Sequence, residues 1–265
     1  MKLLTLNCHS WQEEQQLEKL DILAKTITER EYDVIALQEV SQLADAPQEG
    51  GYKKGHFGLE LLKRLSALDR TEDQMHWSFC HYGYDVYEEG VALISRLPVT
   101  EKDSFFITKS EDPDHWKTRA VPRITVNAGD QLIDFYSCHL GWWSDEEELY
   151  TEQVDRLLKR QHPDRLSFYM GDFNNHAGLK EEGYDLLLTK GLKDTYTLAA
   201  TKDSGTTVFG EIAGWEGNAQ PLRIDYIFAS ESVKVKSSRV IFNGEHYPVV
   251  SDHFGVEVEL KIKLF

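Results

Sequence analysis

The chain has 265 residues and a formal net charge of −16, from 29 Lys and Arg against 45 Asp and Glu. Nucleic-acid affinity comes largely from basic side chains that neutralise phosphates, so this acidic composition disfavours a general nucleic-acid-binding function. The length allows one large hydrophobic core, and no Pro-, Gly- or Ser-rich linker interrupts it, so we expect one domain over residues 1–265.

The elements predicted in chain order alternate between strands and helices. Residues 12–30 predict an amphipathic helix that begins with Ser10 and Glu13 spaced as a capping box. Residues 33–37 form an apolar run typical of a strand buried on both faces. Residues 41–56 are polar and contain several glycines, which predicts a long surface loop. The remaining predicted elements are helices at 59–66, 145–159 and 178–190 and strands at 3–6, 76–81, 90–95, 99–107, 120–127, 131–138, 166–170, 206–209, 224–229, 233–242 and 254–262.

The cysteine content indicates a reducing compartment. Cys8, Cys80 and Cys138 form no close pair, and an odd number cannot complete an internal set of disulfides. The apolar start at residues 1–6 is too short for a signal sequence, and no later segment is apolar over the length that a bilayer requires. We therefore expect a cytoplasmic protein without a membrane segment. The sequence does not indicate its oligomeric state.

Polar side chains recur at the points where predicted strands end. The apolar run 166–170 is broken by Gly171, and Asp172 and Asn174 follow. If the strands bring their ends to one edge of a sandwich, these side chains form a cleft rich in oxygen ligands with two imidazoles. That composition suits a hard cation such as Mg²⁺ and the hydrolysis of a phosphate ester. The other residues in such positions are Asn7, Glu39, His139, Asp225, Asp252 and His253.

Glu39 and Asp252 are the strongest metal candidates. Each follows an apolar run and has a hydrogen-bonding neighbour able to orient it, Gln38 and Ser251 respectively. A single carboxylate in such a place is more often an ordinary solvated side chain. In this sequence polar side chains recur at several strand ends, which weakens that explanation.

The two histidines allow a structural and a catalytic explanation. A lone histidine after a strand is more often structural, but His253 adjoins Asp252, and Asp225 is placed to hold its other ring nitrogen. Such a carboxylate raises the pKa of an imidazole and fixes its tautomer. A cationic imidazole then stabilises the charge that develops on a transferring phosphoryl group.

Seven short motifs follow one another along the chain from residue 6 to residue 253. They are Leu6-Asn7, Leu37-Gln38-Glu39-Val40, Gly90-Val91-Ala92-Leu93-Ile94-Ser95-Arg96, Cys138-His139-Leu140, Gly171-Asp172-Phe173-Asn174, Arg223-Ile224-Asp225-Tyr226-Ile227 and Ser251-Asp252-His253. Together they resemble the ordered motifs of the endonuclease/exonuclease/phosphatase superfamily, the deoxyribonuclease-I-like fold. One such motif is weak evidence, whereas seven in order are specific and cover almost the whole chain.

The resemblance implies an α/β fold, a four-layered sandwich of two mixed β-sheets flanked by helices. It also implies a divalent metal in the cleft, Mg²⁺ or alternatively Mn²⁺. Asn7, Glu39 and Asp252 would lie at or near that metal.

The same resemblance implies the catalytic roles. Asp172 and Asn174 would position or activate the attacking water and bind a phosphate oxygen. His253, supported by Asp225, would contact the scissile phosphate, and His139 would act as an acid or a phosphate ligand on the other side. Water would attack in line without a covalent intermediate.

The predictions about the substrate rest on residues in loops. Trp142, Trp143 and Trp215 lie in loops that contain glycine, where a flat apolar wall for a ligand is the favoured explanation and core packing the alternative. Arg119 stands in a basic group with Lys117 and Arg123. We expect Arg119 to bind a phosphate oxygen because a guanidinium matches that geometry, although surface charges flanking a strand would look the same.

A narrower resemblance concerns residues 4–14, Leu-Thr-Leu-Asn-Cys-His-Ser-Trp-Gln-Glu-Glu, together with residues 33–40. These stretches are similar to the maltose 6′-phosphate phosphatases of the superfamily. The likeness implies a small-molecule phosphate ester as substrate, a disaccharide phosphate that is hydrolysed to free sugar and inorganic phosphate. The three tryptophans would then stack on the sugar.

Two other functions stay open. A phosphodiesterase acting on nucleic acid would need a long basic groove, and one acting on a sphingomyelin-like lipid would need an export signal or an exposed apolar loop; neither is visible in the sequence. A catalytically silent binding protein of the same fold is the third possibility. It is disfavoured because every expected position holds a chemically competent residue.

Overall fold

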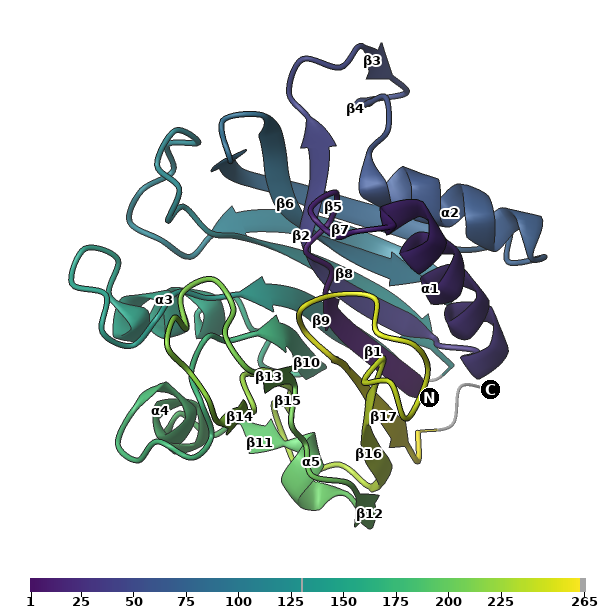
Figure 1. Cartoon of the computed structure of the whole chain (residues 1–265). Helices are drawn as coiled ribbons and strands as arrows, with labels where there is room; N and C mark the ends of the chain where they lie inside the picture. Colours follow the sequence, from purple (N-terminus) through teal and green to yellow (C-terminus); the bar gives the residue numbers. More distant parts are fainter. Residues whose placement is uncertain (130, 263–265) are drawn as a thin grey trace.

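The computed structural model describes residues 1–129 and 131–262. Two large sheets dominate the structure (Figure 1). The helices are α1 (Gln16–Arg30), α2 (Phe57–Ala67), α3 (Tyr150–Leu158), α4 (Gly183–Thr189) and α5 (Thr195–Leu198). The strands are β1 (Lys2–Asn7), β2 (Val34–Leu43), β3 (Gln48–Glu49), β4 (Tyr52–Lys53), β5 (Gln74–Gly83), β6 (Tyr87–Ser95), β7 (Val99–Phe106), β8 (Ala120–Ala128), β9 (Gln131–His139), β10 (Leu166–Asp172), β11 (Lys193–Asp194), β12 (Thr201–Lys202), β13 (Val208–Phe209), β14 (Pro221–Leu222), β15 (Asp225–Ala229), β16 (Val235–Ile241) and β17 (Gly255–Leu260).

Both large sheets are mixed. The first has the strand order β12-β16-β17-β1-β2-β6-β5, and the second has the order β11-β15-β10-β9-β8-β7. β1 pairs in parallel with β2 and antiparallel with β17, so that Lys2 lies opposite Glu259. β10 likewise pairs in parallel with β9 and antiparallel with β15. Within each sheet, central strands that pair with one another therefore come from distant parts of the chain.

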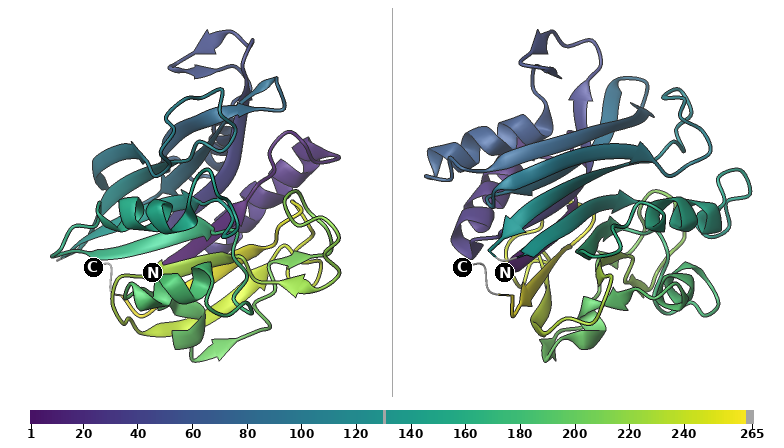
Figure 2. Two further views of the ribbon diagram at one scale, coloured as in Figure 1. Left: turned by 90° about the vertical axis from the view of Figure 1, so that its left-hand side faces the viewer. Right: turned by 180° about the vertical axis from the view of Figure 1, so that it is seen from behind.

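Three apolar clusters hold four layers together. The inner faces of the sheets meet in a core that includes Leu93 of the first sheet and Phe168 of the second. The outer face of the first sheet packs against Leu23 of α1 and Leu61 of α2, and that of the second packs against Val154 of α3 and Leu187 of α4. Figures 1 and 2 show these helix pairs on opposite sides of the sheets. The predicted four-layered α/β sandwich is confirmed.

Several predicted boundaries are wrong at loops. Residues 41–56 are not one long loop, because β2 continues to Leu43 and a β3–β4 hairpin follows. The first helix begins at Gln16 without a side-chain cap, and the Ser10 hydroxyl instead accepts from the backbone N–H of Ser41 at 2.8 Å. The helices predicted at 145–159 and 178–190 are shorter, α3 and α4.

A buried polar link joins the two sheets. The Gln38 amide of β2 donates to the hydroxyl of Ser137 in β9 at 3.0 Å, and that hydroxyl donates to the backbone oxygen of Leu37 at 3.2 Å. The Thr5 hydroxyl of β1 donates to the Gln38 side-chain oxygen at 3.3 Å. Because buried hydrogen bonds are costly to break without replacement, the link fixes the register of one sheet against the other.

The three cysteines are all buried and free. No helix among residues 1–129 and 131–262 is both long and apolar enough to cross a membrane.

Candidate active site

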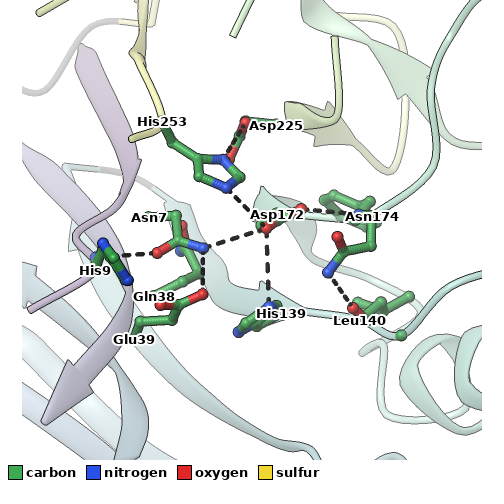
Figure 3. Close-up of polar contacts among 12 residues, drawn as sticks. Asn7, His9, Gln38, Glu39, His139, Leu140, Asp172, Asn174, Asp225 and His253 are labelled. Atoms are coloured by element: carbon green, nitrogen blue, oxygen red, sulfur yellow. Dashed lines mark hydrogen bonds and ion pairs between the residues drawn. The ribbon is translucent and has the colours of Figure 1, made fainter. Parts of the chain in front are cut away.

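The strand ends meet at one cavity of about 210 Å³. Asn7 at the end of β1 is in register with Gln38, and Asp172 at the end of β10 is in register with both His139 and Asp225. Figure 3 shows these side chains pointing toward one another from the two sheets. The cavity is lined by His9, Glu39, His81, Tyr82, Gly83, Tyr84, Glu89, Trp116, Arg119, His139, Trp142, Asp172, Asn174, Ile212, Ala213, Asp252 and His253.

Glu39 is placed by an irregularity in its strand. The register of β2 against β6 shifts between Leu37 and Val40, and Glu39 has a left-handed backbone with φ of 52°. The Asn7 amide donates to Glu39 Oε1 at 2.8 Å and to Asp172 Oδ2 at 3.2 Å (Figure 3). One side chain therefore ties a carboxylate of the first sheet to a carboxylate of the second.

Asp172 depends on the glycine before it. Gly171 has φ of 151°, and a Cβ at this position would lie 1.8 Å from the backbone oxygen of Cys138 in the neighbouring strand. After Asp172, Asn174 takes φ of 48°, donates its backbone N–H to Asp172 Oδ1 at 2.8 Å and donates its side-chain amide to the Leu140 oxygen at 2.9 Å. Both polar groups are thus fixed in the cavity wall.

Two imidazoles flank Asp172. His253 Nε2 and His139 Nε2 each lie 3.8 Å from Asp172 Oδ2, and all three side chains are buried. His253 Nδ1 lies 3.0 Å from Asp225 Oδ2, as predicted, so its tautomer is fixed by that carboxylate (Figure 3).

The two imidazoles differ in charge. Burial lowers the pKa of His253, but the negative charges of Asp225 and Asp172 outweigh it and raise the value to about 10. Burial and then the positive charge of Arg119 hold the pKa of His139 well below its ordinary range. Burial and the charge of Asp225 raise the pKa of Asp172 to about 7. At neutral pH the site thus pairs a cationic with a neutral imidazole, a division typical of acid–base chemistry.

The oxygen ligands fit a hard cation. Burial, and repulsion from Asp252, raise the pKa of Glu39, since two carboxylates converge on one place. A divalent cation would offset that repulsion; Asn7 turns its amide nitrogen toward Glu39, and its side-chain oxygen accepts from the backbone N–H of His9 at 3.2 Å. Two compact groups of potential ligands occur among the described residues, namely His9, Glu13 and Asp252, and Asp172, Asp225 and His253. In the second group His253 Nδ1 is already engaged by Asp225.

The predicted basic group does not form one patch. Lys117 pairs with Asp145 at 2.8 Å, and Arg123 pairs with Glu101 at 3.3 Å, so both are neutralised by carboxylates. Arg119 is buried in the cavity wall, where its Nη1 donates to the Trp116 oxygen at 2.9 Å and its Nε has no protein partner. Of the three, only Arg119 lines the cavity.

The predicted tryptophan wall is corrected in part. Trp142 lines the cavity, and its ring centroid lies 6.1 Å from that of Trp116. Trp143 lies outside the cavity and packs edge-on against Tyr150, because consecutive residues of this loop point to different sides. Trp215 also lies outside the cavity lining, and its Nε1 donates to the Asn174 side-chain oxygen at 3.3 Å. Trp215 therefore supports a site residue without forming the wall.

Several lining residues were not singled out from the sequence. His9 contacts Glu13 at 2.7 Å, and His81 lies opposite Glu89 across the β5–β6 pair with Nε2 and Oε1 3.5 Å apart. Tyr84 lies in the turn between those strands. Polar residues at inward-facing positions of β5 and β6 were the available signal, but the side that each strand presents depends on its pairing.

Two packed mixed sheets that carry acids and histidines in a cavity across their strand ends define a class of phosphoric-ester hydrolases. The chain belongs to the Endonuclease/Exonuclease/phosphatase family, whose model matches residues 4–253. Members of this family hydrolyse phosphoric esters and generally depend on a divalent metal.

Solved structures share the fold over nearly the whole chain. An endonuclease/exonuclease/phosphatase family protein from Leptotrichia buccalis C-1013-b is 41% identical, with a TM-score of 0.93 and coverage of 98% of this chain and 99% of that one. A mannosyl-6-phosphatase from Bacteroides thetaiotaomicron VPI-5482 is 18% identical, with a TM-score of 0.74 and coverage of 98% and 99%. Truncated TDP2 from Caenorhabditis elegans is 16% identical, with a TM-score of 0.63 and coverage of 97% and 95%. No curated protein matches the chain.

Proposed function

We propose that the protein is a Mg²⁺-dependent phosphomonoesterase that acts on a sugar phosphate, such as maltose 6′-phosphate. The observation that carries the choice of a monoester is the charge of the cavity. Among the described residues that line it, Arg119 is the one Lys or Arg. A single guanidinium matches one phosphate group, whereas a nucleic-acid backbone needs a row of basic side chains.

The metal site in this proposal consists of Asn7, Glu39 and Asp252. When bound, Mg²⁺, or alternatively Mn²⁺, polarises a phosphate oxygen and offsets the charge of the transition state. Glu39 and Asp252 both line the cavity, and burial and their mutual repulsion raise the pKa of Glu39, which supports a cation between them. The Ser251 hydroxyl, 3.2 Å from Asp252 Oδ1, orients the third ligand.

The remaining residues act on the phosphate and the water. Asp172, with a pKa near neutrality, accepts a proton from the attacking water, and Asn174 helps to position the water and a phosphate oxygen. Cationic His253, held by Asp225, stabilises the charge on the scissile phosphate from one side. Neutral His139 contacts the phosphate from the other side, next to Arg119. Attack by water in line requires no covalent intermediate.

The similar fold of a mannosyl-6-phosphatase supports a sugar phosphate as substrate. A cytoplasmic location stays part of the proposal, in keeping with three unpaired cysteines.

Phosphate release from a panel of esters tests this function. The panel contains maltose 6′-phosphate, glucose 6-phosphate and nucleotides, each with Mg²⁺ and with chelator, alongside plasmid DNA and sphingomyelin. We expect chelator-sensitive release from a sugar phosphate that is lost in Asp172→Ala and in His253→Ala. Cleavage of plasmid or lipid without turnover of any monoester would move the protein to the phosphodiesterases.

A further inference from the structure

The turn between β5 and β6 holds an aromatic residue in an unfavourable backbone conformation. The backbone N–H of Val86 donates to the Gly83 oxygen at 3.2 Å, and the two central residues, Tyr84 and Asp85, have φ of 51° and 60°. Two left-handed central residues define a type I′ turn, which favours Gly, Asn or Asp. A bulky aromatic side chain at the first central position costs folding free energy, and such strain concentrates at functional sites.

The strained turn is held in place on both sides. The backbone N–H of Tyr82 donates to the Pro113 oxygen at 2.8 Å, and that of Ala44 at the end of β2 donates to the Val86 oxygen at 2.9 Å. Figure 1 shows the β5–β6 hairpin reaching the same end of the molecule as the segment before β8. Tyr84 lines the cavity yet is 61% exposed, so its ring lies at the mouth rather than in a core.

Aromatic rings also line the cavity from other segments. Trp116 and Trp142 line it from the segments before β8 and after β9, and Trp116 is 53% exposed. Lys117, next to Trp116, is anchored by Asp145 at 2.8 Å, which holds this segment close to the loop that carries Trp142. Lys117 Nζ lies 5.6 Å from the centroid of the Trp116 ring, and more than half of the Tyr84 and Trp116 surface stays exposed. Such surface is suited to stacking on a flat or ring-shaped ligand.

Beside these rings lie the side chains of His81 and Glu89, and the guanidinium of Arg119 adjoins them. Burial and the charge of Glu39 raise the pKa of Glu89 to about 8, while burial and Arg119 lower the pKa of His81 to about 3. His81 Nδ1 lies 3.1 Å from the Thr118 backbone oxygen and 3.4 Å from Arg119 Nη1, and His81 Nε2 faces Glu89 Oε1 at 3.5 Å. These donors and acceptors suit hydroxyl groups, because Arg119 is engaged by the phosphate in the proposed reaction and no second Lys or Arg is among the described residues that line the cavity; a lipid chain would need an apolar floor.

We propose that Tyr84, Trp116 and Trp142 form the subsite for the leaving group. This subsite binds a sugar ring that carries hydroxyl groups, and Tyr84 determines the preference for such a leaving group. The inference rests on the proposed phosphatase function and extends it to residues of the β5–β6 turn. In this arrangement the phosphate lies between His139, His253 and Arg119, and the sugar extends toward the β5–β6 turn. Tyr84 contacts the ring of the leaving group and takes no part in the bond-breaking step.

A pair of matched variants tests the role of Tyr84. Tyr84→Gly removes the ring and relieves the left-handed strain, whereas Asp85→Gly relieves the same strain one residue later and leaves the ring. We expect Tyr84→Gly to lower kcat/KM for maltose 6′-phosphate by about tenfold, mainly through KM, and to leave kcat/KM for glycerol 3-phosphate within about twofold of the wild type. Asp85→Gly should leave both values unchanged. Equal changes for the two substrates in Tyr84→Gly, or no change for either, would overturn the assignment.

Direct binding separates this inference from the proposed function. Maltose carries no phosphate, so its binding to the protein, followed by quenching of tryptophan fluorescence, does not require catalysis. We expect saturable quenching in the wild type and in Asp85→Gly and a loss of about tenfold in affinity in Tyr84→Gly. If no monoester is hydrolysed but this pattern of maltose binding holds, the phosphatase function fails and the subsite stands. If sugar phosphates are hydrolysed but the three proteins bind maltose equally or not at all, the subsite fails and the phosphatase function stands.

Discussion

Replacing Asp225 with Asn removes the negative charge that keeps His253 protonated. The carboxylate lies 3.0 Å from His253 Nδ1, and both side chains are buried. The pKa of His253 is about 10 because the charges of Asp225 and Asp172 outweigh burial. With Asp172 and Asp252 remaining, we expect this pKa to fall to about 8, roughly half of the way to the ordinary value of about 6.5.

The size of the effect follows from that pKa change. Each pKa unit corresponds to about 1.4 kcal/mol, so a fall of about 2 units removes roughly 3 kcal/mol from the preference for the imidazolium. If half or more of that preference is expressed in the transition state, kcat/KM falls about 10- to 100-fold. The loss grows with pH, because the variant histidine is neutral above pH 8.

Two measurements check this prediction. Nitrogen NMR of the histidine side chains in metal-free protein follows the pKa of His253 directly, and the pH profile of phosphate release with Mg²⁺ follows its role. We expect the alkaline limb of kcat/KM to move down by about 2 pH units in Asp225→Asn and to stay in place in Asp85→Asn, a charge change outside the cavity. A variant histidine that remains cationic at pH 10, or an alkaline limb that does not move, would show that Asp225 does not control the charge of His253.

Two predictions concern stability. Glu257→Gln breaks the bidentate pair with Arg30, whose contacts are 2.8 and 2.6 Å, and urea denaturation at pH 7 should show a loss of about 2 kcal/mol. Burial raises the pKa of Glu257, but the hydrogen bond and charge of Arg30 outweigh burial and lower it below the ordinary value of about 4.3. The Glu257 carboxylate therefore stabilises the fold above that ordinary value, and this stabilisation disappears as the pH falls through the lower pKa of the folded state. The same difference in free energy of unfolding between wild type and variant at pH 7 and at pH 3 would contradict this. Gly171→Ala should lower the free energy of unfolding by about 2–5 kcal/mol, since the added Cβ collides with the Cys138 backbone. Gly191 has φ of 101° but open space around it, so Gly191→Ala should lower that free energy by only about 1–2 kcal/mol. Similar melting temperatures for the two variants would refute the collision.

The sequence predicted most of the fold because its strands are apolar on both faces. The run before Asp172 and the run before Glu39 are buried between a second sheet and a helix layer, so local composition alone marked them as strands. Helix starts were less predictable. Ser10 and Glu13 have the spacing of a cap, but tertiary contacts to β2 and to His9 occupy them instead.

The candidate site was predictable to the extent that it consists of strand ends. The registers that place Asn7 beside Gln38 and Asp172 beside His139 follow from parallel pairing of neighbouring strands. The outward turn of Trp143 and the pairing of His81 with Glu89 depend on loop conformation and strand register, which no short stretch of sequence specifies.

The pairing of β1 with β17 has a consequence for how the protein is made. β1 is synthesised long before β17, so one edge of β1 stays unpaired until the strand that begins at Gly255 is made, and the Asn7 backbone oxygen likewise lacks its partner, the Ser251 hydroxyl. Contacts between such distant segments form slowly, and an unpaired strand edge is prone to wrong partners in the meantime. Nascent chains that stall before residue 252 therefore hold neither the β1–β17 pair nor the Asp252 and His253 side chains of the cavity. The cavity can therefore be complete only after residue 253 has been synthesised, and the shorter chain is the form that most needs chaperone protection.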